Sequence, residues 1–445
     1  MLKPKAMVLG HDRYLNQSLL RAGYQLTGVF SPVDLANLNK EGRAHYSRLL
    51  NVRDYGALDS LCAVAAHLRA EGPIQVFGAS ELRLYATAFL AEQLGVKGAF
   101  ERALLTRDKR LMKEALKGRV TAARFASLPD PSTPAEMQAA AEALGWPLVL
   151  KPVSGMGSKQ TYLLASPQDL AKIGSAGTSE IVLNDHRMLE QRVDGQEFHV
   201  DAFWQDGRAI YFQVFRYNVA PLRFFFDDQE PLFYTMSQSE QSHRRLYARA
   251  RALQAKVNKR LGLRQGMTHM EFFQREDGHL VFSEIASRIG GGPVRSALRH
   301  LYGRDPYDLY AEAGRGKRLA PLRPKRGQAV CAAWVQRCRT GRVLEMSSAE
   351  EIQRRPGVLE AWTPVHPGMW VKKDSGQDAF YELLVGAEDE LAVEARLKDL
   401  QPHIHMRLGG RFSPQGLILQ ACEAWKRWRG GRLTWTMVRG RIWDL

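Results

Sequence analysis

Short apolar runs alternate with helix-like stretches over about the first hundred residues, and this alternation limits the possible folds more than any other feature. The runs at 6–10, 24–30 and 74–79 are typical of strands, whereas 15–22 and 81–94 are typical of helices. Strands that alternate with helices form parallel α/β units. Because the first strand is not followed by the glycine pattern GxGxxG, we expect a Rossmann-like parallel domain without a dinucleotide fingerprint.

The middle of the chain is richer in expected strands than the N-terminal part. Helices are expected over 109–117, 135–144 and, as a long basic segment, 240–261. A mixture of this kind predicts α+β lobes rather than a second parallel domain. The expected strands cover residues 146–152, 161–164, 180–183, 188–192, 197–204, 209–215, 266–274 and 280–285.

The composition changes after Pro321, where Arg323–Arg326 has the character of a linker. A final lobe follows, with expected strands at 328–335 and 368–373 and a helix over 388–400. We therefore predict four units. They are an N-terminal α/β domain (1–105), a small lobe with a phosphate-binding loop (106–187), a large lobe with a metal site (188–322) and a C-terminal lobe with a basic, Trp-rich tail (323–445).

Composition excludes several classes of protein. Among 445 residues, 45% are hydrophobic and 25% are charged, which excludes wholesale disorder. The net charge of +16 suggests acidic partners, anionic substrates or nucleic acid. The four cysteines form no CxxC pair, so zinc ribbons and disulfide frameworks are not expected. The chain also lacks a long apolar run and a signal peptide, so we expect a cytoplasmic protein without a membrane span.

A glycine-containing loop follows the strand that delivers Lys151. Its small residues include Ser154, Gly155, Gly157 and Ser158. Glycines allow backbone N–H groups to approach an anion closely, and a nearby lysine adds positive charge, which suits a triphosphate. The loop lacks the GxxxxGK[ST] spacing of a Walker A motif, and a plain hairpin turn is the alternative.

Two glutamates flank a tight Asp194-Gly195 turn. Glu190 ends one apolar run and Glu197 opens the next. Two carboxylates placed in this way could reach the same edge of a ligand. The alternative is the solvated end of a hairpin, which a charged turn of this kind often forms.

Glu271 and Glu284 lie on the two arms of a hairpin whose turn is Asp277-Gly278. They stand at comparable distances from the turn, so they could face one another. Converging carboxylates repel unless a cation lies between them, and oxygen ligands of this kind suit Mg²⁺ bound with nucleotide phosphates. Arg288 and three glycines follow and would add a cation beside the metal. The alternative is that both glutamates face water.

These three segments, in this order, resemble the ATP-grasp superfamily over roughly residues 1–320. Asp108-Lys109 supplies an aspartate–lysine pair that opens a helix before the nucleotide domain, as in that superfamily. The resemblance implies an ATP-grasp fold of class α/β with α+β lobes. In this fold an N-terminal Rossmann-like domain precedes a two-lobed ATP-binding core and a small C-terminal lobe. ATP and Mg²⁺ are the implied cofactors.

The resemblance also implies roles for individual residues. Around the nucleotide, the implied contacts are Lys109 and Lys151 with the phosphates, the loop Ser154–Lys159 as a lid, Glu190 with the backbone of Gln191 to Val193 at the adenine, and Glu197 at the ribose. Around the reaction, they are Glu271 and Glu284 with Mg²⁺ and Arg288 with the reacting carboxylate or acyl phosphate.

Several further positions bear on the reaction. The superfamily usually has Glu-x-Asn at the second metal carboxylate, whereas this chain has Glu284-Ile285-Ala286, and alanine cannot coordinate a metal. His269, two residues before Glu271, could take a proton from an attacking amine, line the pocket, or pack as a structural histidine. Arg216 and Arg223, beside an aromatic stretch, are a further candidate site for a carboxylate.

Residues 328–401 resemble the C-terminal lobe of the amino-acid ligase branch, which includes carnosine synthase. The implied activity is ATP-dependent ligation of a carboxylate, such as an amino acid, to an amine. It would proceed through an acyl phosphate, form an amide bond and release ADP and phosphate. Small carboxylate and amine substrates are the expected partners, and a homodimer is expected by analogy.

Three alternatives remain open at this point. The acceptor could be an acidic carrier protein or a peptide terminus, since the charge of +16 would steer such a partner. The tail 407–445, where arginines interleave with tryptophans, could bind single-stranded nucleic acid, although a packed helix with a basic rim is favoured. Finally, Ala286 is the one feature that would suit a nucleotide-binding protein that has lost catalysis.

Overall fold

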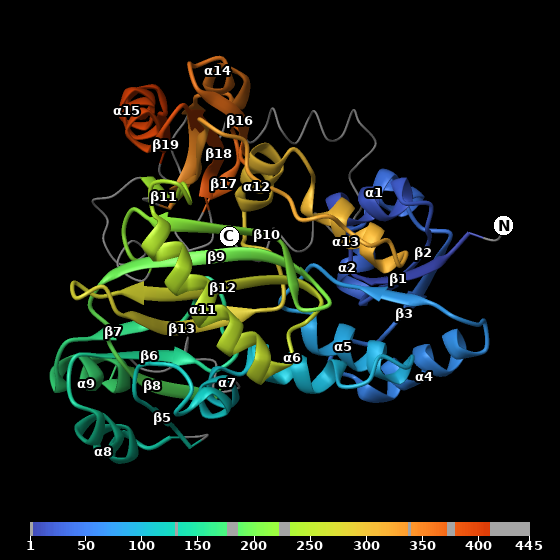
Figure 1. Cartoon of the computed structure of the whole chain (residues 1–445), viewed down its shortest axis with the longest axis horizontal. Helices are drawn as coiled ribbons and strands as arrows, with labels where there is room; N and C mark the ends of the chain where they lie inside the picture. Colours follow the sequence, from blue (N-terminus) through green and yellow to red (C-terminus); the bar gives the residue numbers. More distant parts are fainter. Residues whose placement is uncertain are drawn as a thin grey trace.

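The structure is a computed structural model, and it describes residues 3–129, 132–175, 186–221, 232–336, 340–371 and 379–409. The expected strand at 180–183 and the Trp-rich part of the tail, from residue 410 on, lie outside these ranges. The N-terminal domain lies beside the core, and the final lobe lies at one end of the core (Figure 1).

The N-terminal domain is the expected parallel α/β unit. Its strands lie in the order β3-β2-β1-β4, and β1 pairs in parallel with both β2 and β4. Apolar clusters cover both faces of this sheet, as burial of a parallel sheet requires. The elements are β1 (Lys5–Leu9), α1 (Arg13–Arg21), β2 (Gln25–Phe30), α2 (Pro32–Asn37), α3 (Lys40–Ala44), β3 (Arg48–Asn51), α4 (Leu58–Arg69), β4 (Gln75–Phe77) and α5 (Leu84–Gln93).

Two helices joined end to end lead into the core, α6 (Ala99–Arg107) and α7 (Lys109–Leu116). Asp108 separates them and caps α7, because its carboxylate accepts hydrogen bonds from the backbone N–H groups of Arg110 (2.9 Å) and Leu111 (3.3 Å). This cap fixes Lys109 at the first turn of α7.

The small lobe is an antiparallel sheet in the order β5-β8-β6-β7. Its central strand β6 pairs with β8 so that Val149 lies opposite Glu190, and Lys151 is two residues further along. A leucine-rich cluster joins the sheet to the lobe's two helices. The elements are β5 (Phe125–Ser127), α8 (Pro134–Leu144), β6 (Leu148–Pro152), β7 (Tyr162–Leu164), α9 (Pro167–Ser175) and β8 (Arg187–Gln191).

A long sheet forms the rest of the core, in the order β13-β12-β9-β10-β11-β14-β18-β16. The basic helix α11 (Arg244–Leu261) lies across the part formed by β9, β10, β12 and β13 (Figure 1), and its apolar residues pack on that face. The strands are β9 (Gln196–Gln205), β10 (Arg208–Tyr217), β11 (Leu232–Ser237), β12 (Gly266–Gln274), β13 (Leu280–Ala286), β14 (Ala329–Gln336), β16 (Val358–Trp362) and β18 (Ala379–Ala387).

The same sheet runs from the large lobe into the C-terminal lobe, because β11 pairs with β14 across the expected linker. The three boundaries between the four predicted units stay predictions, and neither β11 nor β18 was expected from the sequence. Within the described ranges, every helix is too short or too polar to cross a membrane. The other elements are α12 (Val294–Tyr302), α13 (Pro306–Gly314), β15 (Gly341–Met346), α14 (Ala349–Gln353), β17 (Trp370–Val371), α15 (Glu390–Leu400), the 3₁₀ helix η1 (Gln401–His403) and β19 (Met406–Gly409).

Candidate active site

A cavity of about 1090 Å³ opens between the small-lobe sheet and the β12–β13 hairpin. The N-terminal domain and the C-terminal strands complete its walls. Of the predicted site residues, Ser154 does not line the cavity, and its hydroxyl lies 3.2 Å from that of Tyr85 instead. The predicted residues that line it are Lys109, Lys151, Gly155, Gly157, Ser158, Glu190, Gln191, Val193, Glu197, His269, Glu271, Glu284 and Arg288.

The hairpin places the two predicted metal carboxylates side by side, because Glu271 and Glu284 are directly paired across β12 and β13. Lys109 Nζ lies 3.3 Å from Glu284. Burial opposes ionisation of Glu284, but the charges of Lys109 and Lys151 outweigh it and lower the pKa of Glu284 to about 2. Glu284 is therefore an anion at neutral pH.

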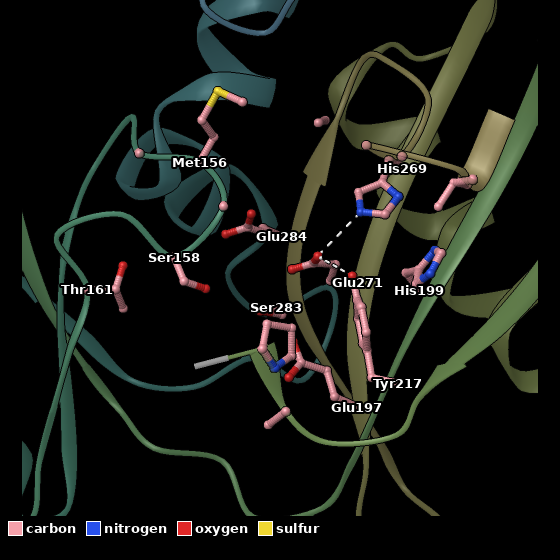
Figure 2. Close-up of a pocket in the computed structure, with 18 of the residues that line it drawn as sticks. Met156, Ser158, Thr161, Glu197, His199, Tyr217, His269, Glu271, Ser283 and Glu284 are labelled. Atoms are coloured by element: carbon pink, nitrogen blue, oxygen red, sulfur yellow. Dashed lines mark hydrogen bonds and ion pairs between the residues drawn. The ribbon is translucent and has the colours of Figure 1, made fainter. Parts of the chain in front are cut away.

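Glu197 is a third carboxylate at this cavity, which Glu271 and Glu284 also line (Figure 2). It is only 7% exposed, and its carboxylate has no hydrogen bond or ion pair to another described residue. Burial and the negative charges of Glu271 and Glu284 raise the pKa of Glu197 well above its ordinary value. Three carboxylates gathered in this way suit Mg²⁺, which prefers oxygen ligands. Glu271 and Glu284 would be its ligands.

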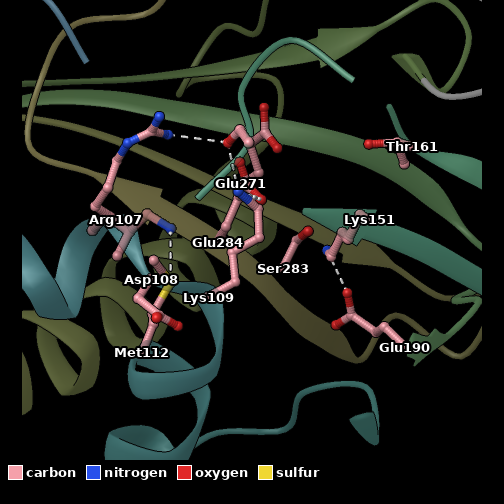
Figure 3. A network of polar contacts seen from close by, with 12 residues as sticks. Arg107, Asp108, Lys109, Met112, Lys151, Thr161, Glu190, Glu271, Ser283 and Glu284 are labelled. Atoms are coloured by element: carbon pink, nitrogen blue, oxygen red, sulfur yellow. Dashed lines mark hydrogen bonds and ion pairs between the residues drawn. The ribbon is translucent and has the colours of Figure 1, made fainter. Parts of the chain in front are cut away.

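The opposite wall carries a buried row of alternating charge. Glu190 pairs with Lys113, at 2.5 Å. It also pairs with Lys151 (Figure 3). Burial would raise the pKa of Glu190, but the two ammonium groups hold it below its ordinary value. Lys113 Nζ also donates to the carbonyl of Ser283, at 2.9 Å, which ties this wall to β13.

Lys113 was not predicted, although it lies one helical turn after Lys109 and shares its face of α7. Because Glu190 is engaged by both lysines, its side chain holds Lys151 at the cavity instead of offering a free carboxylate to a ligand. Residues Gln191 to Val193 do line the cavity, where the predicted adenine hinge would lie.

The base of the glycine loop is fastened to the start of α7. Lys109 Nζ donates to the carbonyl of Gly155 at 2.8 Å, and its backbone N–H donates to the carbonyl of Val153 at 2.9 Å. Gly157 further along has φ of +59°, a conformation that favours glycine. The loop thus has a fixed base, and its role as a lid stays a prediction.

Arg288 reaches the cavity from the end of β13, and it pairs with Glu81 of the N-terminal domain. Glu81 also accepts a hydrogen bond from Arg107, at 2.9 Å. Burial opposes the charge of Arg288, but Glu81 outweighs it and raises the pKa of the guanidinium. The N-terminal domain therefore helps to position this arginine, which the sequence alone did not indicate.

A buried network supports Glu271 from behind. Tyr217 donates to Glu271 at 3.1 Å, and His269 Nε2 lies 3.3 Å from the same carboxylate (Figure 2). His269 Nδ1 lies 3.2 Å from Asp201, which also lies 2.8 Å from His199 Nδ1. Burial would lower the pKa of His269, but Asp201 and Glu271 raise it to about 10. Both ring nitrogens are engaged, which favours a positioning role for His269.

His199, Asp201 and Tyr217 were not predicted. Glu197, His199 and Asp201 occupy alternate positions of β9, which otherwise consists largely of apolar residues. Polar residues at a period of two place their side chains on one face of a strand, and this signal could have identified the network.

The further candidate carboxylate site, Arg216 with Arg223, stays a prediction. Arg216 is paired with Glu394 at 2.8 Å, and Arg223 lies outside the described ranges.

Comparison with known proteins assigns this site to a class. Residues 144–296 match the family described as the ATP-grasp domain. This confirms the predicted recognition, the fold class and the expectation of an enzyme of the ATP-grasp ligase type.

Two amino-acid ligases are similar to this chain, one in sequence and one in fold. The chain is 28% identical over 298 residues, covering 65% of this chain and 69% of the relative, to the L-arginine-specific L-amino acid ligase of Bacillus subtilis. Its fold is similar to that of an L-amino acid ligase from Bacillus licheniformis, with a TM-score of 0.71 and 18% identity, covering 92% of this chain and 100% of that one.

A more distant relative was solved with a nucleotide and a metal. The biotin carboxylase domain of the 2-oxoglutarate carboxylase from Hydrogenobacter thermophilus, in complex with MgADP, has a TM-score of 0.63 and 15% identity, covering 98% of this chain and 97% of that one. Its ligands agree with the predicted cofactors, ATP and Mg²⁺.

Proposed function

We propose that this protein joins a carboxylate to an amine at the expense of ATP, and that amino acids supply at least one of the two groups. The observation that carries the proposal is the pairing of two walls of opposite charge in one cavity. Lys151 and Lys109 can neutralise phosphate oxygens, while Glu271 and Glu284 can hold Mg²⁺ against the same phosphates. The similarity to two amino-acid ligases supports the substrate class.

The reaction that suits this site has two steps. First, a substrate carboxylate oxygen attacks the γ-phosphorus, so the bond from that phosphorus to the ADP oxygen breaks and an acyl phosphate forms. Next, the amine nitrogen attacks the acyl carbon. A C–N bond forms, the C–O bond to phosphate breaks, and the nitrogen loses a proton. Arg288 can bind the negative charge that develops on the oxygens of the acyl group.

Water must be kept from the acyl phosphate between the two steps. The glycine loop lies between β6 and β7 at the cavity. Its base is fastened by Lys109 and Arg107, which both donate to the carbonyl of Gly155, and by the contact of Ser154 with Tyr85. We propose that residues 154–159 fold over the phosphates when ATP is bound.

The test is ADP release from Mg-ATP by the full chain, with amino acids, other carboxylates and amines added singly and in pairs. We expect release only when a carboxylate and an amine are both present, together with one amide product for each ADP. Release that needs neither addition, or no release with any pair, would contradict the proposal.

An acidic carrier protein or peptide terminus is the second candidate acceptor, and the net charge of +16 favours it. Such a partner would bind through long-range charge, so its reaction should weaken steeply as salt rises. Reaction with a small amino acid should change little over the same range of salt. Measuring ADP release at low and high salt with each acceptor distinguishes the two.

A further inference from the structure

A row of side chains crosses the long sheet from the large lobe into the C-terminal lobe. Phe233 on β11 is paired with Trp334 on β14, Trp334 with Glu382 on β18, and Glu382 with Trp362 on β16. Directly opposed residues of antiparallel strands point to the same face of the sheet. Phe233, Trp334 and Glu382 all line the cavity, so this face is a wall of the site.

The row begins at the metal carboxylates. Tyr217, which donates a hydrogen bond to Glu271, stacks on Phe233 with ring centroids 5.4 Å apart. Phe233 in turn contacts Trp334, again with centroids 5.4 Å apart. The strands β10 and β18, which carry Tyr217 and Glu382, are separated by β11 and β14. Three strand spacings amount to about 14 Å. The aromatic wall therefore leads away from the metal site and ends at Glu382.

Glu382 lacks a charged partner among the described residues, unlike Glu394 and Glu360 of the same lobe. Glu394 pairs with Arg216, and Glu360 contacts Arg299. Glu382 has no hydrogen bond or ion pair to another described residue, and burial raises the pKa of its carboxyl. A partly buried carboxylate without a partner is unfavourable, and a cation from a ligand would remove that penalty.

We propose that Glu382 binds the cationic end of an amino-acid substrate, an ammonium or guanidinium group at the tip of its side chain, while Trp334 and Phe233 pack on the apolar stem. The inference rests on the proposed ligase function and names the substrate class of the same site. A flat indole beside the carboxylate suits a cation, which is attracted to aromatic faces.

The position of Glu382 distinguishes the side-chain cation from the α-ammonium group. The α-ammonium is attached to the carbon next to the reacting carboxylate, or is itself the attacking amine. In either case it must lie near the metal and Arg288. Glu382 lies across β11 and β14 from the strand of Tyr217, which contacts the metal carboxylate Glu271, and this separation suits a group at the far end of the substrate.

The test compares cationic amino acids with neutral molecules of similar shape. L-arginine is paired with L-citrulline, and L-lysine with L-norleucine, in ADP release with a common second substrate. Titration calorimetry of the same amino acids follows, with Mg²⁺ and a non-hydrolysable ATP analogue present. The proteins are the wild type, Glu382→Gln, Glu382→Lys and, as a matched control, Glu350→Gln on the exposed side of α14.

We expect the wild type and Glu350→Gln to bind the cationic member of each pair more tightly. Glu382→Gln should lose about 30-fold or more for the cationic members, as when one partner of a buried charge pair is removed, and should change little for the neutral ones. Glu382→Lys should bind the anionic amino acid L-glutamate more tightly than L-arginine or L-lysine. Melting temperatures close to wild type show that the variants are folded.

The inference would be overturned if the wild type bound the neutral member of each pair as tightly as the cationic one. It would also be overturned if Glu382→Gln still bound the cationic members more tightly, or if it lost the same affinity for cationic and neutral members. Release of ADP with neutral amino acids alone would overturn the cation site and leave the ligase intact. Absence of ADP release with every pair would overturn the ligase, and calorimetry would still decide whether Glu382 binds the cation.

Discussion

On the small-lobe wall of the cavity, the single carboxylate of Glu190 lies between the ammonium groups of Lys113 and Lys151, whereas on the hairpin wall the three carboxylates of Glu197, Glu271 and Glu284 face Lys109 and His269. The small-lobe wall carries an excess of positive charge, and the hairpin wall carries an excess of negative charge. Each excess is unfavourable when buried. A metal–nucleotide complex has phosphates for the first wall and a cation for the second, so the comparison identifies the ligand that would satisfy both.

The largest expected effect comes from removing charge on the hairpin wall. Glu284→Gln should lower kcat for ADP release by about a thousandfold or more, since loss of an outer partner of a metal already costs about 10–100-fold. Glu276→Gln, on the exposed turn of the same hairpin, is the control and should retain full activity. Steady-state kinetics over a range of Mg²⁺ concentrations would decide, and an active Glu284→Gln enzyme would remove Glu284 from the metal site.

On the small-lobe wall, the two lysines should behave differently. Lys151 lines the cavity, so Lys151→Met should raise KM for ATP by about 10–100-fold through loss of a charge-assisted contact. Lys113 lies behind Glu190 with only 3% of its surface exposed, so Lys113→Met should chiefly lower the free energy of unfolding, by about 3–5 kcal/mol. Urea unfolding measured beside the ATP kinetics separates the two effects. Equal KM values for both variants would show that Lys151 does not contact the nucleotide.

A smaller effect on kcat is expected from a substitution in the network behind the hairpin wall. Asp201 accepts a hydrogen bond from the backbone N–H of Gly290 at 2.6 Å and orients His269, which contacts Glu271. Asp201→Asn should lower kcat by about 10–100-fold and raise the Mg²⁺ concentration needed, with little change in KM for ATP. A change in melting temperature with no change in the Mg²⁺ requirement would reduce this network to a purely structural role.

The smallest expected effect lies outside both walls. Arg216 and Glu394 form a partly exposed ion pair, with side chains 27% and 39% exposed. Arg216→Ala should therefore cost less than about 1 kcal/mol of stability and leave ADP release unchanged. A clear rise in KM for a carboxylate substrate would instead restore Arg216 as a substrate contact.

The sequence predicted the parts of the site that depend on local pattern. The Asp277-Gly278 turn fixed the register that pairs Glu271 with Glu284, and Asp108 gave the helix start that positions Lys109. The parallel N-terminal sheet followed from alternating strands and helices. Each of these features is set by residues close together in the chain.

Long-range pairing could not be predicted in the same way. Glu81 meets Arg288, and Glu382 meets Trp334, only because separate domains and strands come together. The strand β18 was missed because its nine residues, Ala379–Ala387, are apolar at almost every position and show no alternation. A central strand that is buried on both faces loses the period of two that identifies a strand.

The most direct test of the proposed acyl-phosphate route follows an oxygen atom of the carboxylate substrate. A carboxylate substrate labelled with ¹⁸O at both oxygens is incubated with Mg-ATP, an amine and the full chain, and the phosphate released is analysed by mass spectrometry. If the acid attacks the γ-phosphorus, one ¹⁸O moves into inorganic phosphate and ADP carries none. Unlabelled phosphate, or label in AMP with release of pyrophosphate, would contradict the acyl-phosphate route.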